Sequence, residues 1–301
     1  MQKKALEKKT RRTFHEIHKA QGDDNYIFTR LSTLLSTDFL KVEPDFFKGK
    51  ICLDAGCGSN ANATFNMLSL GAEKVYAFDL DETIVKTAPK YLRKFKRKYE
   101  LSIGNVFKIH FPDNYFDFTH CAGVLHHTVD VYKGLAELAR VTKKGGTLYF
   151  DVYGKGGLIR EITTSLRLKY QQDKEFRSVI DNLDQKVFKD FLGWIQSVMS
   201  QKGDRMGSEI SLALVSELFD KDLVLTIKDR LQAPLYHEDS EEELIKCLQK
   251  NGFRDIVRLT KYPRYKNVRR FLSPLYEQYD NKFARFLYGS GQIQLKAIKN
   301  F

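Results

Sequence analysis

The feature that most constrains the fold is the alternation of short apolar segments with amphipathic segments between residues 51 and 151. The apolar segments have the length of buried strands, and those between them have the period of helices that pack on one face. The predicted strands are KICLDA (50–55), KVYAFD (74–79), LSIGNV (101–106), FDFTHCAG (116–123) and GTLYFDVY (146–153). Strands that alternate with helices form a parallel sheet with crossover helices, so we expect an α/β fold.

The chain changes character after the fifth predicted strand. GKGG (154–157) is a flexible break, and mainly helical periodicity follows it. Two more predicted strands, 253–262 and 292–300, have no obvious crossover helix between them, which favours an antiparallel addition to the sheet. The resulting division is an N-terminal basic tail with cap helices (1–49), a core (50–153), a helical insertion (154–236), and a C-terminal completion of the sheet (237–301) that contains an aromatic and basic excursion (263–289).

Local signals place the ends of three helices. Asp130 can cap a helix over 131–141. Ser240 with Glu243 has the spacing of a capping box. Asn60 is expected to cap the helix after the first strand.

The segment ICLDAGCGSNAN (51–62) is the strongest candidate for a ligand site. Gly56 and Gly58 allow a tight turn and let a ligand approach the main chain, at the positive N-terminal end of a helix. With Ala61 the pattern also fits a dinucleotide site. A carboxylate at Asp54 suits an ammonium group better than a pyrophosphate, and Asp79, which ends the next strand, can accept hydrogen bonds from ribose hydroxyls.

Four segments in order carry a family resemblance. They are LDAGCGSN, VYAFDLD, IGNVFKIHFPDNYFDFTHCAGVLHHTVD and LARVTKKGGTLYFDVYG. Together they resemble the class I S-adenosylmethionine-dependent methyltransferases, in the branch of ubiquinone/menaquinone-biosynthesis and small-molecule enzymes. The resemblance covers about 50–153 and weakly 238–300. It implies a seven-stranded Rossmann-like sheet, with five parallel strands, a sixth strand and an antiparallel seventh, and a helical insertion after strand five.

The resemblance also implies how the methyl donor is held. The implied binding residues are Asp54, Ala55, Gly56, Gly58, Asn60, Asp79, Leu80, Asn105, Val106, Cys121 and Ala122. Asp54 corresponds to the acid near the methionine amino group and Asp79 to the ribose acceptor. The chain departs from the family pattern at Asn60, where a third glycine is usual, and at Asn105, where an aspartate usually receives the adenine amine.

Four residues are candidates for catalysis at the reacting end of this site: His126, His127, Tyr153 and His237. Of the two adjacent histidines, His126 is expected to face the cofactor, and the alternative is that it only orders the loop. A histidine or tyrosine there can act as a base, although proximity alone can also accelerate methyl transfer.

The four cysteines are scattered and form no CxxC pair, so neither a metal site nor a disulfide framework is expected. Some pyrimidine methyltransferases attack their base with a cysteine at the position of Cys121, but their Pro-Cys motif is absent here. Cys57 is expected to fill a tight loop and to have no chemical role.

A lid over the acceptor is expected from the insertion, the excursion and the region 13–40, with the glycines of 154–157 as its hinge. The expected wall residues are Phe14, His15, Tyr26 and Phe28.

A net charge of +12 keeps an RNA acceptor open as an alternative to a small molecule. The charge is scattered, although basic and aromatic residues interleave at 258–271. A non-catalytic S-adenosylmethionine-binding protein is the other alternative. With no long apolar run and no apolar segment behind the basic N-terminus, we expect a cytoplasmic protein without a membrane span.

Overall fold

The computed structural model describes residues 2–22, 35–184, 186–187, 190, 197, 223–259 and 282–300. Two of the predicted wall residues, Tyr26 and Phe28, and most of the excursion 263–289 lie outside these ranges.

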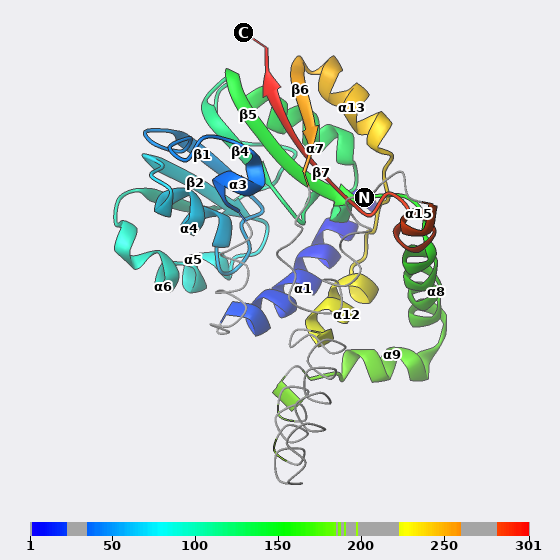
Figure 1. Cartoon of the computed structure of the whole chain (residues 1–301). Helices are drawn as coiled ribbons and strands as arrows, with labels where there is room; N and C mark the ends of the chain where they lie inside the picture. Colours follow the sequence, from blue (N-terminus) through cyan, green and yellow to red (C-terminus); the bar gives the residue numbers. More distant parts are fainter. Residues whose placement is uncertain are drawn as a thin grey trace.

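The core of the protein is one seven-stranded sheet (Figure 1). The strands are β1 (Ile51–Ala55), β2 (Lys74–Asp79), β3 (Tyr99–Ile103), β4 (Phe116–Cys121), β5 (Thr142–Tyr153), β6 (Phe253–Arg258) and β7 (Gln292–Lys299). Their order is β3-β2-β1-β4-β5-β7-β6. The first five run parallel, and β7 pairs antiparallel with both β5 and β6. The predicted fold class is confirmed.

Two strand boundaries differ from the prediction. β3 ends at Ile103, so Gly104 and Asn105 lie beyond the sheet. A Cβ on Gly104 would lie 2.9 Å from the ring of Phe78, which explains a glycine at this crowded exit. β5 begins at Thr142, earlier than its apolar pattern suggested, because Phe116 of β4 pairs with that residue.

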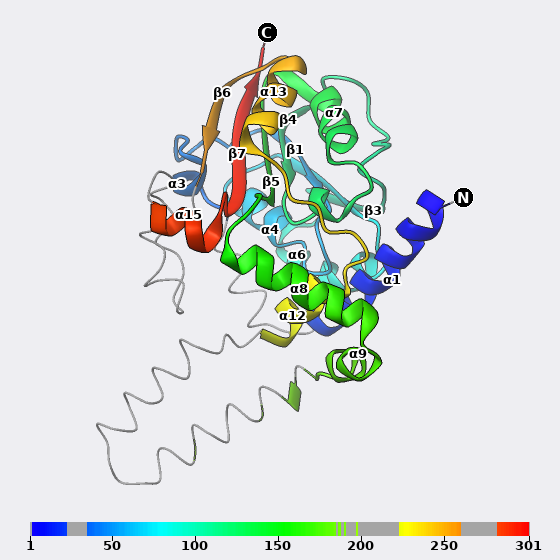
Figure 2. The same ribbon diagram turned by 90° about the vertical axis from the view of Figure 1, so that its right-hand side faces the viewer.

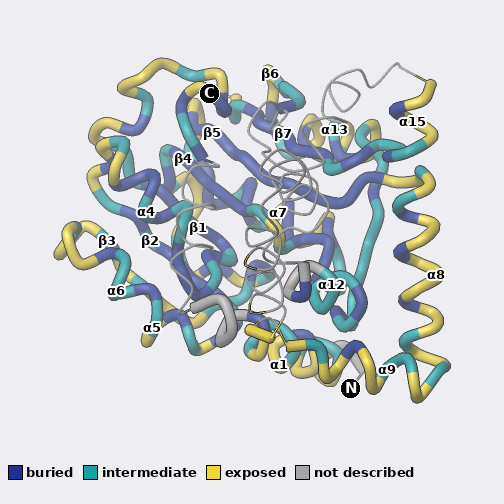
Figure 3. Tube along the Cα trace, turned by 60° about the horizontal axis from the view of Figure 1, so that its bottom comes forward, coloured by how far each residue is buried: buried dark blue, intermediate teal, exposed yellow. Residues whose placement is uncertain are grey.

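Helices cover both faces of the sheet, and others lie beyond the carboxyl ends of the parallel strands (Figures 1 and 2). They are α1 (Gln2–Gly22), α3 (Thr37–Leu40), α4 (Asn62–Ser69), α5 (Ile84–Thr87), α6 (Pro89–Leu92), α7 (Val131–Val141), α8 (Leu158–Gln172), α9 (Lys174–Asp181), α12 (Leu223–Gln232), α13 (Glu241–Lys250) and α15 (Lys282–Tyr288), with short 3₁₀ turns η1 (Arg93–Phe95) and η2 (Leu125–His127). Those beyond the strand ends are α1, α8 and α12. α7 and α13 pack into one hydrophobic cluster, and α3, α4, α5 and α6 pack into a second. The central strands β1, β2, β4, β5 and β7 are therefore mostly buried, and Figure 3 shows the middle of the sheet as the most buried part of the chain.

Two of the three predicted caps form. Asp130 accepts a hydrogen bond from the backbone of Lys133, and Ser240 accepts one from the backbone of Glu243. The Glu243 carboxylate pairs with Lys155 at 3.2 Å. The prediction for Asn60 is wrong: the residue before α4 is Ala61, which has φ 46° and makes no side-chain cap bond.

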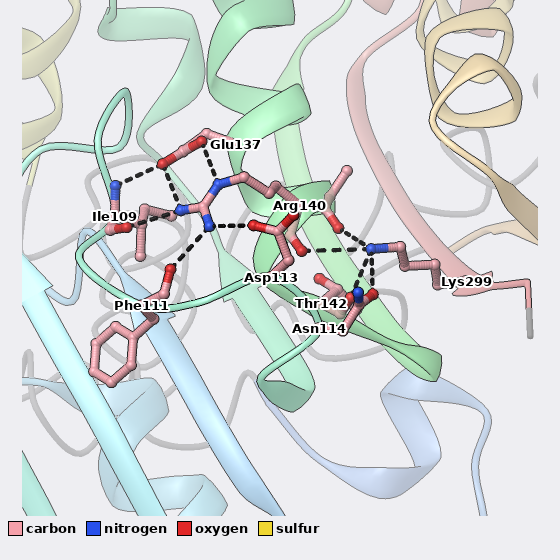
Figure 4. Close-up of polar contacts among 9 residues, drawn as sticks. Ile109, Phe111, Asp113, Asn114, Glu137, Arg140, Thr142 and Lys299 are labelled. Atoms are coloured by element: carbon pink, nitrogen blue, oxygen red, sulfur yellow. Dashed lines mark hydrogen bonds and ion pairs between the residues drawn. The ribbon is translucent and has the colours of Figure 1, made fainter.

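Arg140 on α7 ties down the loop between β3 and β4 (Figure 4). Its guanidinium donates to the carbonyl oxygens of Ile109 and Phe111, each at 2.8 Å, and to the carboxylates of Glu137 and Asp113. Glu137 also accepts from the backbone of Ile109. The hydrogen bonds from Arg140 lower the pKa of Glu137. The network fixes the segment that continues from Gly104 and Asn105.

Replacing Arg140 with glutamine is expected to lower the free energy of unfolding by about 2 kcal/mol, because two carbonyls and two carboxylates lose their donor. Urea denaturation of Arg140→Gln measures this loss. Lys144→Gln, which removes an exposed cation near the start of β5, should leave stability unchanged within about 0.5 kcal/mol. Equal stability of the two variants would mean that the Arg140 network contributes nothing.

Candidate functional site

The glycine turn after β1 is built for close approach of the main chain. Gly56 and Gly58 have φ angles of 78° and 65°, a conformation that side chains rarely adopt. The backbone N–H of Gly56 donates to the carbonyl of Phe78 at the end of β2, which holds the turn against the neighbouring strand. A Cβ on Gly56 would lie 2.1 Å from Cγ2 of Val124. No other residue fits this position without displacing Val124 and the segment that follows β4.

Asp54 is fully buried, and both of its oxygens have partners. Oδ2 accepts from the backbone N–H and the hydroxyl of Thr64, at 2.9 and 2.7 Å. Oδ1 lies 2.9 Å from Nδ1 of His120. The carboxylate thus satisfies a free N–H in the first turn of α4, which is the role that the sequence assigned to Asn60.

His120 was not predicted, yet it lies beside Asp54 in the sheet register between β1 and β4. Its ring stacks on Tyr149, with centroids 5.4 Å apart, and the Tyr149 hydroxyl donates to Gln294. A chain of polar side chains therefore crosses four neighbouring strands, from Asp54 on β1 through β4 and β5 to Gln294 on β7.

Asp79 ends β2 next to the glycine turn. Oδ2 accepts from the backbone of Gly58 and Oδ1 from the backbone of Asp81, both at 3.0 Å. Each carboxylate oxygen can accept a second hydrogen bond. Asp79 is therefore fixed in place and can still receive hydroxyl groups.

A cavity of about 480 Å³ lies at the carboxyl ends of the strands, where open parallel sheets bind their ligands. Of the predicted binding residues, the cavity is lined by Asp54, Gly56, Gly58, Asn60, Asp79, Leu80, Asn105, Val106 and Ala122. Ala55 and Cys121 are fully buried behind this wall, in a hydrophobic cluster. Asn105 accepts from the backbone N–H of Phe107 at 2.9 Å, which folds the loop around its own side chain.

α1 covers part of the cavity with one face. Glu7, Thr10, Arg11, Phe14 and Ile17, spaced at helical intervals, line it. The helix is attached to the loop after β2: Arg11 pairs with Glu82 at 2.6 Å, and His15 pairs with Asp81 at 2.8 Å. Of the predicted wall residues, Phe14 lines the cavity, whereas His15 pairs with Asp81 and is not part of the lining.

Three of the four candidate catalytic residues, His126, His127 and Tyr153, form one aromatic cluster, and of the four only His127 lines the cavity. His126 was expected to face the cofactor, but the structure places His127, and not His126, on the cavity wall. The rings of His126 and Tyr153 have centroids 3.8 Å apart, and the backbone of His237 donates to the carbonyl of His126. Burial strongly lowers the pKa of His126, which keeps the imidazole neutral. His126, Tyr153 and His237 support the cavity wall from behind.

His127 meets a residue that sequence reasoning missed. Its Nδ1 lies 2.9 Å from the carbonyl oxygen of Leu235, and its Nε2 lies 3.6 Å from Oδ1 of Asp229 on α12. The Tyr153 hydroxyl reaches Oδ2 of Asp229 at 3.4 Å. Asp229 lines the cavity and lies 102 residues after His127, and no local sequence signal connects the two.

The cysteines near the cavity are unreactive. Burial raises the pKa of both the Cys57 and Cys121 thiols well above the ordinary value. Neither is a nucleophile at neutral pH. Within the described ranges, no three His, Cys, Asp or Glu side chains are grouped to hold a metal ion. None of the described helices has the length and apolar character needed to cross a membrane.

Comparison with known proteins places this site in context. Residues 53–150 match the family model described as "Methyltransferase domain". An uncharacterized protein of Methanocaldococcus jannaschii is 33% identical over 138 residues, which cover 46% of this chain and 53% of that protein. A demethylmenaquinone methyltransferase of Geobacillus stearothermophilus is 35% identical over 102 residues, which cover 33% of this chain and 43% of that protein. A tRNA U34 carboxymethyltransferase of Campylobacter curvus is 30% identical over 151 residues, which cover 48% of this chain and 49% of that protein. The chain thus spans about half the length of these curated relatives.

Proposed function

Because residues 53–150 form a methyltransferase domain of the class I S-adenosylmethionine-dependent superfamily, we propose that the chain transfers the methyl group of S-adenosylmethionine to a small-molecule acceptor. The observation that carries the proposal is that one cavity of about 480 Å³ borders both the glycine turn and the pair of His127 and Asp229. Donor and acceptor can meet there under the cover of α1.

The residues of the cavity fit the donor. Gly56 and Gly58 leave room for the donor along the main chain, and Asp79 is held where it can accept from ribose hydroxyls. Asp54 and His120 form a buried ionisable pair on the cavity wall, so we assign the methionine ammonium to this pair and not to Asp54 alone. Asn105 and Val106 are assigned to the adenine side.

When bound, S-adenosylmethionine supplies a methyl group activated by its positively charged sulfur. The chain's own residues position the acceptor, exclude water and accept a proton. α1 and α12 cover the cavity, while His127 and Asp229 place two proton acceptors on its wall.

A small acceptor is favoured over RNA because α1 is attached across the cavity by the Arg11–Glu82 and His15–Asp81 pairs. A polynucleotide would have to displace this helix. The net charge of +12 and the tRNA-modifying relative are the observations that favour RNA. The lid formed by 154–236 and 263–289, and the cytoplasmic location, stay predictions.

The test is methyl transfer from methyl-labelled S-adenosylmethionine, with two acceptor pools offered side by side: the fraction of a cell extract below about 1 kDa and total tRNA. We expect label in the small-molecule fraction, at a rate that changes little with salt. Label confined to tRNA, with a rate that falls steeply as salt rises, would establish the RNA alternative. Binding of S-adenosylmethionine without label in either pool would favour the non-catalytic alternative.

A further inference from the structure

On the part of the cavity wall formed by η2 and α12, two hydrogen-bond acceptors face each other. A carbonyl oxygen can only accept, so the 2.9 Å contact with Leu235 places the hydrogen of His127 on Nδ1. Burial lowers the pKa of His127, so the ring is neutral at pH 7. Nε2 therefore carries a lone pair, and it faces Oδ1 of Asp229 at 3.6 Å.

The other oxygen of Asp229 has a donor. The Tyr153 hydroxyl lies 3.4 Å from Oδ2 and can donate only to an acceptor such as this carboxylate. The Tyr153 ring is held between His126 and Arg160, whose guanidinium lies 4.2 Å from the ring centroid. Tyr153 is thus a positioning residue that leaves Oδ1 of Asp229 turned toward His127.

The ionisable side chains of described residues that line the cavity are mostly acidic. The one arginine in this described lining, Arg11, pairs with Glu82, while Asp54 and Asp81 lie within hydrogen-bond distance of His120 and His15.

Three further carboxylates, Glu7, Asp79 and Asp229, also line the cavity. Within the described part of the chain, none of them forms an ion pair with a lysine or arginine, and Asp229 has only a longer-range electrostatic interaction with Arg167. Facing acceptors and unbalanced carboxylates are costly in a partly buried site unless a ligand supplies donors and positive charge.

We propose that the acceptor is a primary or secondary amine that enters as its ammonium ion and donates N–H groups to Nε2 of His127 and Oδ1 of Asp229. This inference rests on the proposed function and names its substrate class. An ammonium ion has at least two N–H donors for the two acceptors, and its charge balances Asp229. An alcohol has one donor and no charge, and a carboxylate would be repelled.

The same pair can prepare the amine for methylation. One N–H proton passes to Nε2 of His127, and Asp229 stabilises the imidazolium that forms. The freed nitrogen lone pair forms the new C–N bond as the S–C bond of the donor breaks, and the electrons of that bond stay on sulfur. The imidazolium then returns its proton to water, so atoms and charge balance.

The test is equilibrium binding to the full chain saturated with S-adenosylhomocysteine, so that turnover is not required. The probes are two sets of three compounds, each set an amine, an alcohol and a carboxylate with the same number of carbon atoms. The larger set is 2-phenylethylamine, 2-phenylethanol and phenylacetate, and the smaller set is ethanolamine, ethylene glycol and glycolate. We expect at least one amine to bind about tenfold or more tighter than its alcohol, with the carboxylates weakest.

Two variants separate the carboxylate from general effects. Asp229→Asn keeps the size of the side chain and should abolish the preference for amines while S-adenosylhomocysteine still binds. Glu100→Gln makes the same change on exposed β3, where the carboxylate pairs with Lys74, and should retain the preference.

The inference is overturned if alcohols or carboxylates bind as well as the amines, if no amine in the panel binds, or if the preference survives in Asp229→Asn. Loss of S-adenosylhomocysteine binding by the unmodified chain would instead contradict the proposed function, so the two failures are distinguishable.

Discussion

Gly56→Ala is expected to lower the free energy of unfolding by about 2–4 kcal/mol and to weaken S-adenosylmethionine binding at least about tenfold. Two costs add. The backbone at φ 78° disfavours any side chain, and the new Cβ would lie 2.1 Å from Cγ2 of Val124. Val124 is β-branched, so its side chain has few alternative rotamers. The glycine turn or the segment that follows β4 must therefore move. Calorimetric titration and thermal unfolding measure the two effects.

Gly123→Ala is the matched control for the backbone cost. Gly123 has φ 74°, and a Cβ there would meet no atom within 4 Å. The Gly123→Ala variant should have a free energy of unfolding only about 1–2 kcal/mol lower than that of the unmodified protein. In the double variant Gly56→Ala with Val124→Ala, removal of the clashing methyl groups should make the combined loss smaller than the sum of the two single losses. Strict additivity would show that the contact with Val124 is not the cause.

The second large effect is expected for Asp54→Ala, which should destabilise the protein by about 3–5 kcal/mol and lower the melting temperature by roughly 10 °C. The change leaves three buried donors without their acceptor: the N–H and hydroxyl of Thr64 and Nδ1–H of His120. Thermal and urea unfolding measure the loss.

Asp54→Asn separates acceptor loss from charge loss. The amide oxygen can still accept from Thr64, and the amide NH₂ can donate to His120 if the ring changes tautomer. This variant should recover at least half of the stability that alanine loses. If Asp54→Ala were as stable as the unmodified protein, the carboxylate would not hold the start of α4.

The predictable part of the site is the part encoded locally. Gly56, Gly58 and Asp79 occupy fixed positions relative to strand ends, so a strand–turn–helix pattern places them on the cavity without further knowledge. The same holds for the parallel order of the first five strands.

The residues that sequence reasoning missed depend on tertiary contacts. His120 reaches Asp54 through strand register, across 66 positions of the chain. Asp229 reaches His127 from a helix that follows a long insertion. Which of His126 and His127 lines the cavity depends on the orientation of the short turn η2. The periodicity of neither a strand nor an α-helix predicts that orientation.

The role of Asn60 was misjudged for a related reason. A helix N-terminus needs an acceptor, and an asparagine one residue before α4's N-cap is a reasonable local choice. The buried carboxylate of Asp54 supplies that acceptor from the adjacent strand. Local propensity was overridden by a stronger, charged partner from the sheet.

The most direct measurement of the central claim is calorimetric titration of S-adenosylmethionine into the unmodified chain and into Asp79→Ala, with circular dichroism to confirm that the variant is folded. The account predicts one site per chain in the unmodified protein and an affinity at least about tenfold lower in the variant, since a charged hydrogen-bond acceptor is lost. Absence of binding to the unmodified chain, or undiminished affinity in folded Asp79→Ala, would contradict it.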